Sequence, residues 1–246
     1  MPMPQPAIGL LKKNDEDHQL ERILRRLGYR VFAYTRCHLM FSSLAGHGAN
    51  LALIDRPLGE KEISLIKKYR SRETKNAATI LCCGEGQSPR TPPGCSQLVD
   101  PLDIPALHRA LQQHMTQYDR KKLRASIRLP ALVCDRGEHL LGEVNVLGTG
   151  GAQLQSSTRP LRTGQNLEVV IPLLGQKKEL EIPCQVVYAQ EPVAENNFHY
   201  QAGIQFLTHD DELVRDLEHY LSCHLLTAPD DNGYHYRPAA APSHII

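Results

Sequence analysis

The first half of the chain alternates apolar runs with amphipathic segments. Five runs rich in aliphatic residues are typical of buried strands, at residues 8–11, 29–34, 51–54, 78–83 and 97–99. Apolar residues recur at helical spacing over residues 15–27, 60–72 and 104–115, and residues 35–49 fit a helix or a partial turn. Asn14 or Asp15 is the expected N-cap of the first helix. Strands that alternate with helices predict a parallel sheet covered on both faces, an α/β fold.

The second half alternates apolar and polar residues over shorter stretches. The predicted strands cover residues 126–134, 139–147, 152–155, 166–171, 179–188 and 199–207. Turn signals such as Asp135-Arg136-Gly137 separate them. Short strands between turns predict a small antiparallel barrel or sandwich, an all-β fold. A helix follows, with Thr208 as its expected cap and an apolar stripe, from Leu213 to Leu225, that should cover one end of the barrel.

The composition changes at two places, and these give the domain boundaries. Residues 116–119 form a polar joint, and from residue 227 the chain is rich in proline, alanine and polar residues. We therefore expect a first domain at residues 1–115, a second at residues 116–226 and a disordered tail at residues 227–246.

Charge and hydropathy limit the classes of function. The formal net charge of +1 gives no bulk attraction to DNA or to a membrane surface, so an anion site must be local. No apolar run approaches the ~20 residues of a membrane span, and the proline-containing N-terminus does not resemble a secretion signal. The seven cysteines are an odd number without CxxC spacing, which favours reduced thiols. We expect a cytoplasmic protein without a membrane span.

The chain shows no pattern typical of catalysis or of a metal site. The twelve histidines lack HExxH or paired spacing. Ser222-Cys223-His224 lies on one predicted helix, and no set of nucleophile, base and orienting group can be assembled around it. We therefore expect no enzyme activity and no bound metal.

Two local features can bind an anion. Arg120, Lys121, Lys122 and Arg124 form a basic cluster, in which two arginines four positions apart can make a fork for phosphate. The turn Gly148–Gly151 contains three glycines and lets the backbone approach a ligand closely. Each feature also has a purely structural interpretation, the first as a solvated basic linker and the second as a plain hairpin turn.

Residues 7–115 resemble the receiver domains of two-component response regulators. The third strand ends in Asp55, where that family carries its phosphoacceptor aspartate. The departures are Lys12 and Lys13 at the place of an acidic pair, Asp100 at the place of a lysine, and Cys83 at the place of a hydroxyl residue. Magnesium needs oxygen ligands, and two lysines would repel it. The resemblance implies a pseudo-receiver, a scaffold or dimerisation module that is not phosphorylated.

The inverted charges leave two interpretations of Asp55. Lys12 or Lys13 can pair with the Asp55 carboxylate and hold one fixed state without phosphate. Alternatively, Asp55 is a capping or turn carboxylate at a strand end. The sequence does not choose between them.

Residues 118–226 resemble a PilZ domain in three segments that follow one another in order. Arg120-x-x-x-Arg124 and the strand after it match the family's RxxxR segment and its entry into the barrel. Residues 144–154, VNVLGTGGAQL, occupy the place of the second motif, Asp/Asn-x-Ser-x-x-Gly. Residues 201–207, QAGIQFL, resemble the strand before the family's last helix.

This second resemblance implies reception of cyclic di-GMP, a bacterial second messenger. In the family, the two arginines grip phosphates and stack on guanines, and the second motif wraps a base and a sugar. The binding residues implied for this chain are Arg120, Lys121, Arg124, Asn145, Gly148, Thr149 and Gly151.

The second motif departs from the family pattern. Aligned on Gly151, it has Val146 in place of Asp or Asn and Gly148 in place of Ser. A one-residue slip puts Asn145 in the first place but Leu147 in place of the serine, and Thr149 can supply a hydroxyl from a shifted position. At ~1–3 kcal/mol for each lost polar contact, affinity falls by roughly tenfold to several-thousandfold.

Two functions therefore remain open. The first is a signalling effector, in which cyclic di-GMP on Arg120, Arg124 and the glycine turn reorients the joint at residues 116–120. The second is an adaptor that acts by protein contacts without nucleotide. In either case we expect a protein partner in pilus, flagellar or chemotaxis control, and a homodimer is compatible with both.

Overall fold

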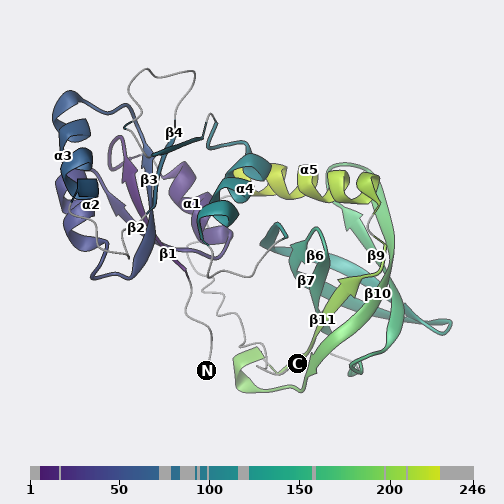
Figure 1. Cartoon of the computed structure of the whole chain (residues 1–246). Helices are drawn as coiled ribbons and strands as arrows, with labels where there is room; N and C mark the ends of the chain where they lie inside the picture. The colour runs from purple at the N-terminus through teal and green to yellow at the C-terminus, as the bar shows by residue number, and fades with distance from the viewer. Residues whose placement is uncertain are drawn as a thin grey trace. The chain divides into compact units, whose positions relative to one another are not determined.

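The computed structural model describes residues 6–227 except 17, 72–78, 84–91, 93–94, 99, 116–121, 157–158, 197 and 209. The tail predicted at residues 227–246 therefore lies outside the described residues, apart from Thr227. Contacts between Cα atoms divide the chain into two compact units, residues 4–121 and residues 122–246. Figure 1 shows the first unit as a sheet with helices and the second as a barrel with one long helix.

The first unit is built on a five-stranded parallel sheet. Its strands are β1 (Ala7–Lys12), β2 (Arg30–Tyr34), β3 (Ala49–Asp55), β4 (Thr79–Cys83) and β5 (Ser96–Leu98). They lie in the order β2-β1-β3-β4-β5, and every neighbouring pair is parallel. The strand order reverses between β1 and β3, so the carboxyl ends of these two strands form the edge where α/β sheets bind ligands. The predicted parallel α/β fold is confirmed.

The helices of the first unit are α1 (Gln19–Arg26), α2 (Cys37–Ser43), α3 (Glu60–Ser71) and α4 (Ile104–His114). The predicted cap of α1 is wrong, because the helix begins after His18 and not after Asn14 or Asp15. The chain first turns through residues 13–16, and the Asp15 carbonyl lies 3.4 Å from the buried Lys12 ammonium. The ambiguous segment at residues 35–49 contains α2 and then enters β3.

A buried charge network ties β1 to α1. The Lys12 side chain is 5% exposed, and its Nζ lies 3.2 Å from Glu21 Oε2 and 3.1 Å from His18 Nδ1. Arg25 donates to the other Glu21 oxygen at 2.8 Å. Burial alone would raise the pKa of the Glu21 carboxyl, but the hydrogen bonds and charges of Arg25 and Lys12 outweigh it, so the pKa is lowered. The lysine at the end of β1 is thus held by α1.

The second unit is a closed antiparallel barrel. Its strands are β6 (Arg124–Asp135), β7 (Glu138–Gly148), β8 (Gly151–Ser156), β9 (Asn166–Leu173), β10 (Lys178–Gln190) and β11 (Tyr200–Phe206). They close in the order β10-β11-β8-β7-β6-β9. Alternate residues point into the barrel, as in β11, where Ala202, Ile204 and Phe206 are buried. Of the two predicted all-β architectures, the barrel is the one observed.

The helix α5 (Asp211–Thr227) follows the barrel and packs against β6 and β7. Its buried stripe consists of Leu217, Tyr220, Leu221 and Leu225. His224 Nε2 lies 3.3 Å from the Ser126 carbonyl on β6. The predicted cap is wrong, because Asp210 and not Thr208 caps the helix, through a 2.6 Å bond from the Leu213 N–H to Asp210 Oδ1. The helix starts at Asp211, two residues later than it would if Thr208 were its N-cap.

We predict that Glu21→Gln destabilises the first unit by about 1–3 kcal/mol at neutral pH, because the buried Lys12 ammonium and the partly exposed Arg25 guanidinium both lose their charged partner. The folded-state pKa of Glu21 lies below its ordinary value of 4.5, so its contribution is full above that pH and disappears as the pH falls through the folded-state pKa. Urea unfolding followed by NMR signals of β1 and β3 at pH 7 and pH 3 measures the difference. The matched control is Glu60→Gln in the first turn of α3. An equal loss at both pH values would contradict the prediction.

Candidate functional site

The glycine turn predicted from the sequence connects β7 to β8 and is tied to two other strands. Gly148 and Gly151 are register partners across the turn. The Thr149 N–H donates to the Leu123 carbonyl at 2.9 Å, and the Gly150 carbonyl accepts from the Phe206 N–H at 3.1 Å. The turn is therefore fixed between the start of β6 and the end of β11.

Arg124 stands directly beside this turn. It is the first residue of β6 and the register partner of Gly148. The side chains of Ala125, Ile127 and Leu129 are buried, whereas Arg124 is exposed, as expected for alternation in a barrel strand. The structure thus brings one arginine of the RxxxR segment and the glycine turn to the same part of the barrel's outer face.

Two of the glycines in the turn are required by close packing. A Cβ on Gly148 would lie 2.9 Å from Arg124 Cβ and 2.9 Å from the Leu123 carbonyl oxygen. A Cβ on Gly151 would lie 2.2 Å from the Ile204 carbonyl oxygen, which is backbone, whereas a Cβ on Gly150 would meet only the flexible side chain of the exposed Lys122. A serine at position 148, as in the family motif, would force the backbone or Arg124 to move.

A polar cluster lies on the same outer face, one step along the strands. Gln153 Nε2 donates to the Tyr188 hydroxyl at 3.1 Å and to Gln201 Oε1 at 3.4 Å. Gln153 is only 6% exposed, although the residues on either side of it, Ala152 and Leu154, are the ones that alternate into the core. An amide buried on the outer face in this way is stabilised by its hydrogen bonds.

Arg124 acts electrostatically on this cluster. Burial raises the pKa of the Tyr188 phenol, while the hydrogen bond from Gln153 and the charge of Arg124 lower it, and burial outweighs both. The charge of Arg124 is thus the third contribution to the pKa of the Tyr188 phenol, after burial and the Gln153 hydrogen bond.

The sequence-predicted binding residues have different outcomes. Arg120 and Lys121 lie outside the described residues. Arg124, Gly148, Thr149 and Gly151 are brought together, with Thr149 7% exposed. Asn145 lies at the irregularity between Val144 and Val146, and its side chain donates to Gln155 on β8. Asn145 is thus engaged away from the turn.

Sequence reasoning missed two residues of this face, namely Gln153 and Tyr188, whereas Lys122 belongs to the basic cluster identified from the sequence. Gln153 could have been found, because it follows Gly151 by two and so shares its face of β8. Tyr188 could not, because the pairing of β10 with β11 shifts between Val186 and Tyr188 and changes the alternation.

The carboxyl edge of the first unit holds the residues that were compared with a receiver site. Lys12 and Asp55 are register partners at the ends of β1 and β3. Burial, followed by the charges of Asp55 and Asp100, raises the pKa of the Cys83 thiol well above its ordinary value. Asp100 Oδ1 accepts the Leu102 N–H at 2.8 Å, a turn bond, and Lys13 is exposed. Lys12, Asp55, Cys83 and Asp100 therefore share one edge of the sheet. The Lys12 ammonium there is bonded to Glu21.

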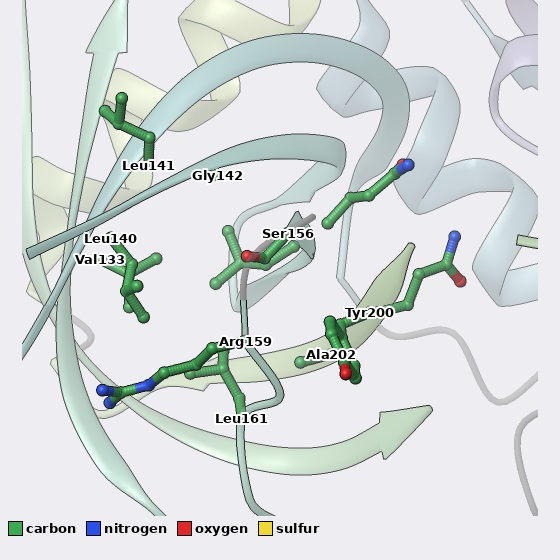
Figure 2. A pocket seen from close by; sticks show the side chains of 12 residues that line it. Val133, Leu140, Leu141, Gly142, Ser156, Arg159, Leu161, Tyr200 and Ala202 are labelled. Atoms are coloured by element: carbon green, nitrogen blue, oxygen red, sulfur yellow. The ribbon is translucent and has the colours of Figure 1, made fainter. Parts of the chain in front are cut away.

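A separate pocket lies on the barrel and is mostly apolar (Figure 2). Its lining includes Val133, Leu140, Leu154 and Leu161. The charged residue of the lining, Arg159, is bound in ion pairs with Asp135, at 2.6 Å, and with Glu138. None of the binding residues predicted from the sequence belongs to this lining. This pocket therefore does not offer a guanidinium to a phosphate.

Two further features are absent from the described part of the chain. Among the described residues, no three His, Cys, Asp or Glu side chains are grouped so that they could hold a metal ion. No helix in the described part of the chain is long and apolar enough to span a membrane.

Comparison with protein families identifies the barrel. The PilZ domain family model matches residues 118–222. This region contains β6 to β11 and most of α5, so the second unit is a PilZ domain. Among curated proteins no match was found.

Several solved structures are similar to part of the chain at low sequence identity. The inhibitor of motility MotI/DgrA of Bacillus subtilis matches with a TM-score of 0.40 and 13% identity, over 46% of this chain and 53% of its own. The PilZ domain of Escherichia coli YcgR with c-di-GMP matches with a TM-score of 0.38 and 17% identity, over 44% and 92%. The K. pneumonia MrkH–c-di-GMP complex matches with a TM-score of 0.37 and 22% identity, over 42% and 51%. The chain thus spans about half the length of the first of these and of the MrkH complex.

We predict that Arg124→Ala raises the pKa of the Tyr188 phenol, because the positive charge that favours the phenolate is removed. The pH titration of ¹³Cζ-labelled tyrosine measures it by NMR, with the Tyr188 signal assigned through Tyr188→Phe. The matched control is Arg128→Ala, four residues further along β6, where the guanidinium is bound to Glu143 at 3.0 and 3.1 Å. The same shift in both variants would show that Arg124 has no particular relation to Tyr188.

Proposed function

We propose that the PilZ domain of this protein binds cyclic di-GMP on the outer face of the barrel, with Arg124 and the Gly148–Gly151 turn as its contacts. The observation that carries the proposal is the position of Arg124, exposed and in register with Gly148. Arg120 and Lys121, on the segment before β6, complete the basic part of the site. Lys122, whose side chain lies against Gly150, adds a further cation.

The chemistry of the ligand fits these groups. A cyclic dinucleotide carries two phosphates and two flat bases. Guanidinium groups offer paired donors to phosphate oxygens and also stack on flat rings. A glycine turn exposes backbone without side chains in the way. The barrel itself supplies the rigid support that holds both features at a fixed separation.

We expect this site to bind cyclic di-GMP less tightly than a site with the complete second motif of the family. Val146 and Gly148 stand where the family has a carboxamide or carboxylate and a hydroxyl. The crowding at Gly148 supports the view that this departure is built into the backbone, because a serine there has no room without a shift. The arginine half of the site is retained.

We propose that the first unit is a pseudo-receiver that transmits the signal through protein contacts. The strand order β2-β1-β3-β4-β5 and the position of Asp55 at the end of β3 support a receiver-like unit. The Lys12–Glu21 pair places a bound cation where a magnesium ion would be needed. The domains in this proposal cover residues 1–115 and 116–226, and the joint at residues 116–120 links binding to output.

The proposed partner is a protein of motility, pilus or chemotaxis control, and a homodimer is compatible with the proposal. MotI/DgrA, one of the structures similar in fold, is an inhibitor of motility. The proposed function is non-catalytic and requires no metal.

A second candidate function is an adaptor that binds no nucleotide. The substituted positions Val146 and Gly148 favour it, because both remove polar groups that the family motif provides. In this case Arg124 would face a protein partner instead of a phosphate.

Titration calorimetry with cyclic di-GMP separates the two functions. We expect the wild-type protein to bind and Arg124→Ala to weaken binding by at least roughly tenfold to a hundredfold, because a charge-assisted contact to phosphate is lost. Arg128→Ala, the matched change on the same strand, should leave the affinity unchanged. Heat that is absent for the wild type, or an equal loss for both arginines, would favour the adaptor.

We also expect that Asp55 is not phosphorylated. Incubation with a small phosphodonor and Mg²⁺, followed by mass spectrometry of the intact chain, should show no added phosphate, because Lys12 repels the cation that the reaction needs. Lys12→Asp, which replaces the repelling cation by a carboxylate, serves as the comparison. Labelling of the wild-type protein at Asp55 would make the first unit a working receiver.

A further inference from the structure

The Gln153–Tyr188–Gln201 cluster is not used by the contacts proposed above, although it lies next to them. Gln153 and Tyr188 are both register partners of Gly203, from opposite sides of β11. Gln153 is also the register partner of Val146, which occupies the position where the family motif has Asp or Asn. The cluster therefore borders the position from which a polar group is missing.

The Tyr188 ring is held in one orientation. A Cβ on Gly203 would overlap ring atoms of Tyr188, so the ring lies flat across the glycine. At its far end the hydroxyl accepts from Gln153 Nε2 at 3.1 Å. Gln153 is fixed in turn by its second bond, to Gln201 Oε1, at 3.4 Å. A partly exposed aromatic ring is thus fixed by packing and by a hydrogen bond before any ligand arrives.

The barrel core does not explain this arrangement. The residues that fill the interior at this level are Val186, Ala202 and Ile204, all 4% exposed or less. Tyr188 and Gln153 belong to the opposite, outer face. Burial of an amide and a hydroxyl there costs desolvation, which their mutual hydrogen bond offsets.

The ring also borders the proposed site, because its partner Gln153 follows Gly151 by two residues on β8, Gly151 pairs with Gly148, and Gly148 pairs with Arg124. The charge of Arg124 also lowers the pKa of the Tyr188 phenol, against the larger effect of burial. A guanidinium and an aromatic face that lie near each other form a pair of surfaces for a flat base. Flat bases stack on aromatic rings whatever their hydrogen-bonding pattern.

We propose that Tyr188 is a ligand-binding residue that stacks on a guanine base of cyclic di-GMP, and that Gln153 is a positioning residue that holds the ring through its hydroxyl. The proposal rests on the proposed function of the PilZ domain. In this proposal, stacking on Tyr188 provides part of the binding affinity that is lost with the altered second motif.

Calorimetry on full-length variants tests the contact. Tyr188→Leu removes the ring and should weaken cyclic di-GMP binding by about five- to a hundredfold. Tyr188→Phe keeps the ring and loses the tether, so its loss should be smaller than that of Tyr188→Leu. Gln153→Met removes the donor to the Tyr188 hydroxyl and so loses the same tether. Its matched control is Gln176→Met, in the turn between β9 and β10, which should bind like the wild type. Wild-type affinity in Tyr188→Leu would overturn the proposal.

A double-mutant cycle tests the positioning role. If Gln153 acts through the Tyr188 hydroxyl, the loss of affinity in Gln153→Met combined with Tyr188→Phe should be no larger than in either single variant. Additive losses would show that Gln153 does not act through Tyr188 and would overturn that part of the proposal. A shared effect on melting temperature alone, with unchanged affinity, would identify the network as purely structural and overturn the whole.

A spectroscopic readout covers the case in which Tyr188→Leu does not fold. With 3-fluorotyrosine incorporated, the Tyr188 ¹⁹F signal, assigned through Tyr188→Phe, should shift on addition of cyclic di-GMP. An unmoved signal at saturation contradicts the stacking contact. If the wild type binds and Arg124→Ala weakens binding while the Tyr188 variants bind normally, only this inference fails. If the wild type does not bind, the proposed function fails together with it.

Discussion

The close approach of the glycine turn to the start of β6 is the constraint on which the candidate site depends. The Thr149 N–H bonds the Leu123 carbonyl, and Gly148 lies so near Arg124 that even one added carbon would collide. Strand pairing therefore converts two motifs distant in sequence into one surface. The same packing explains why position 148 carries no side chain, since a serine there and Arg124 in its present position exclude each other.

The altered motif and the polar cluster beside it belong to one surface. Val146 leaves an apolar position where a polar group would meet a ligand, and its neighbour across the strand is Gln153. Gln153 in turn fixes Tyr188, on which the charge of Arg124 also acts. The outer face thus offers a cation, a glycine-lined turn and an oriented aromatic ring within one network of strand contacts. This combination of groups supports the proposed binding of an anionic ligand with flat rings.

The first unit has a buried positive charge, Lys12, at the end of β1. Lys12 ends β1 beside Asp55 on β3, at the edge where the strand order reverses. Its ammonium is bound to Glu21 on α1 and is nearly inaccessible to solvent. A buried cation needs a paired anion, so the lysine and the glutamate stabilise each other and occupy this corner of the unit.

The sequence by itself determined both fold classes, nearly every strand and the neighbourhood of Arg124 and Gly148–Gly151, because hydrophobic periodicity and short motifs are local signals. It misplaced the caps of α1 and α5, since several adjacent polar residues can each cap a helix and only the path of the chain selects His18 and Asp210. It also places Asn145 in the predicted binding set; in the structure this side chain donates to Gln155, beside an irregularity in the strand pairing. Only the tertiary structure brought Tyr188 and Gln153 beside the turn, because strand register, bulges and barrel closure join residues that no spacing in the sequence relates.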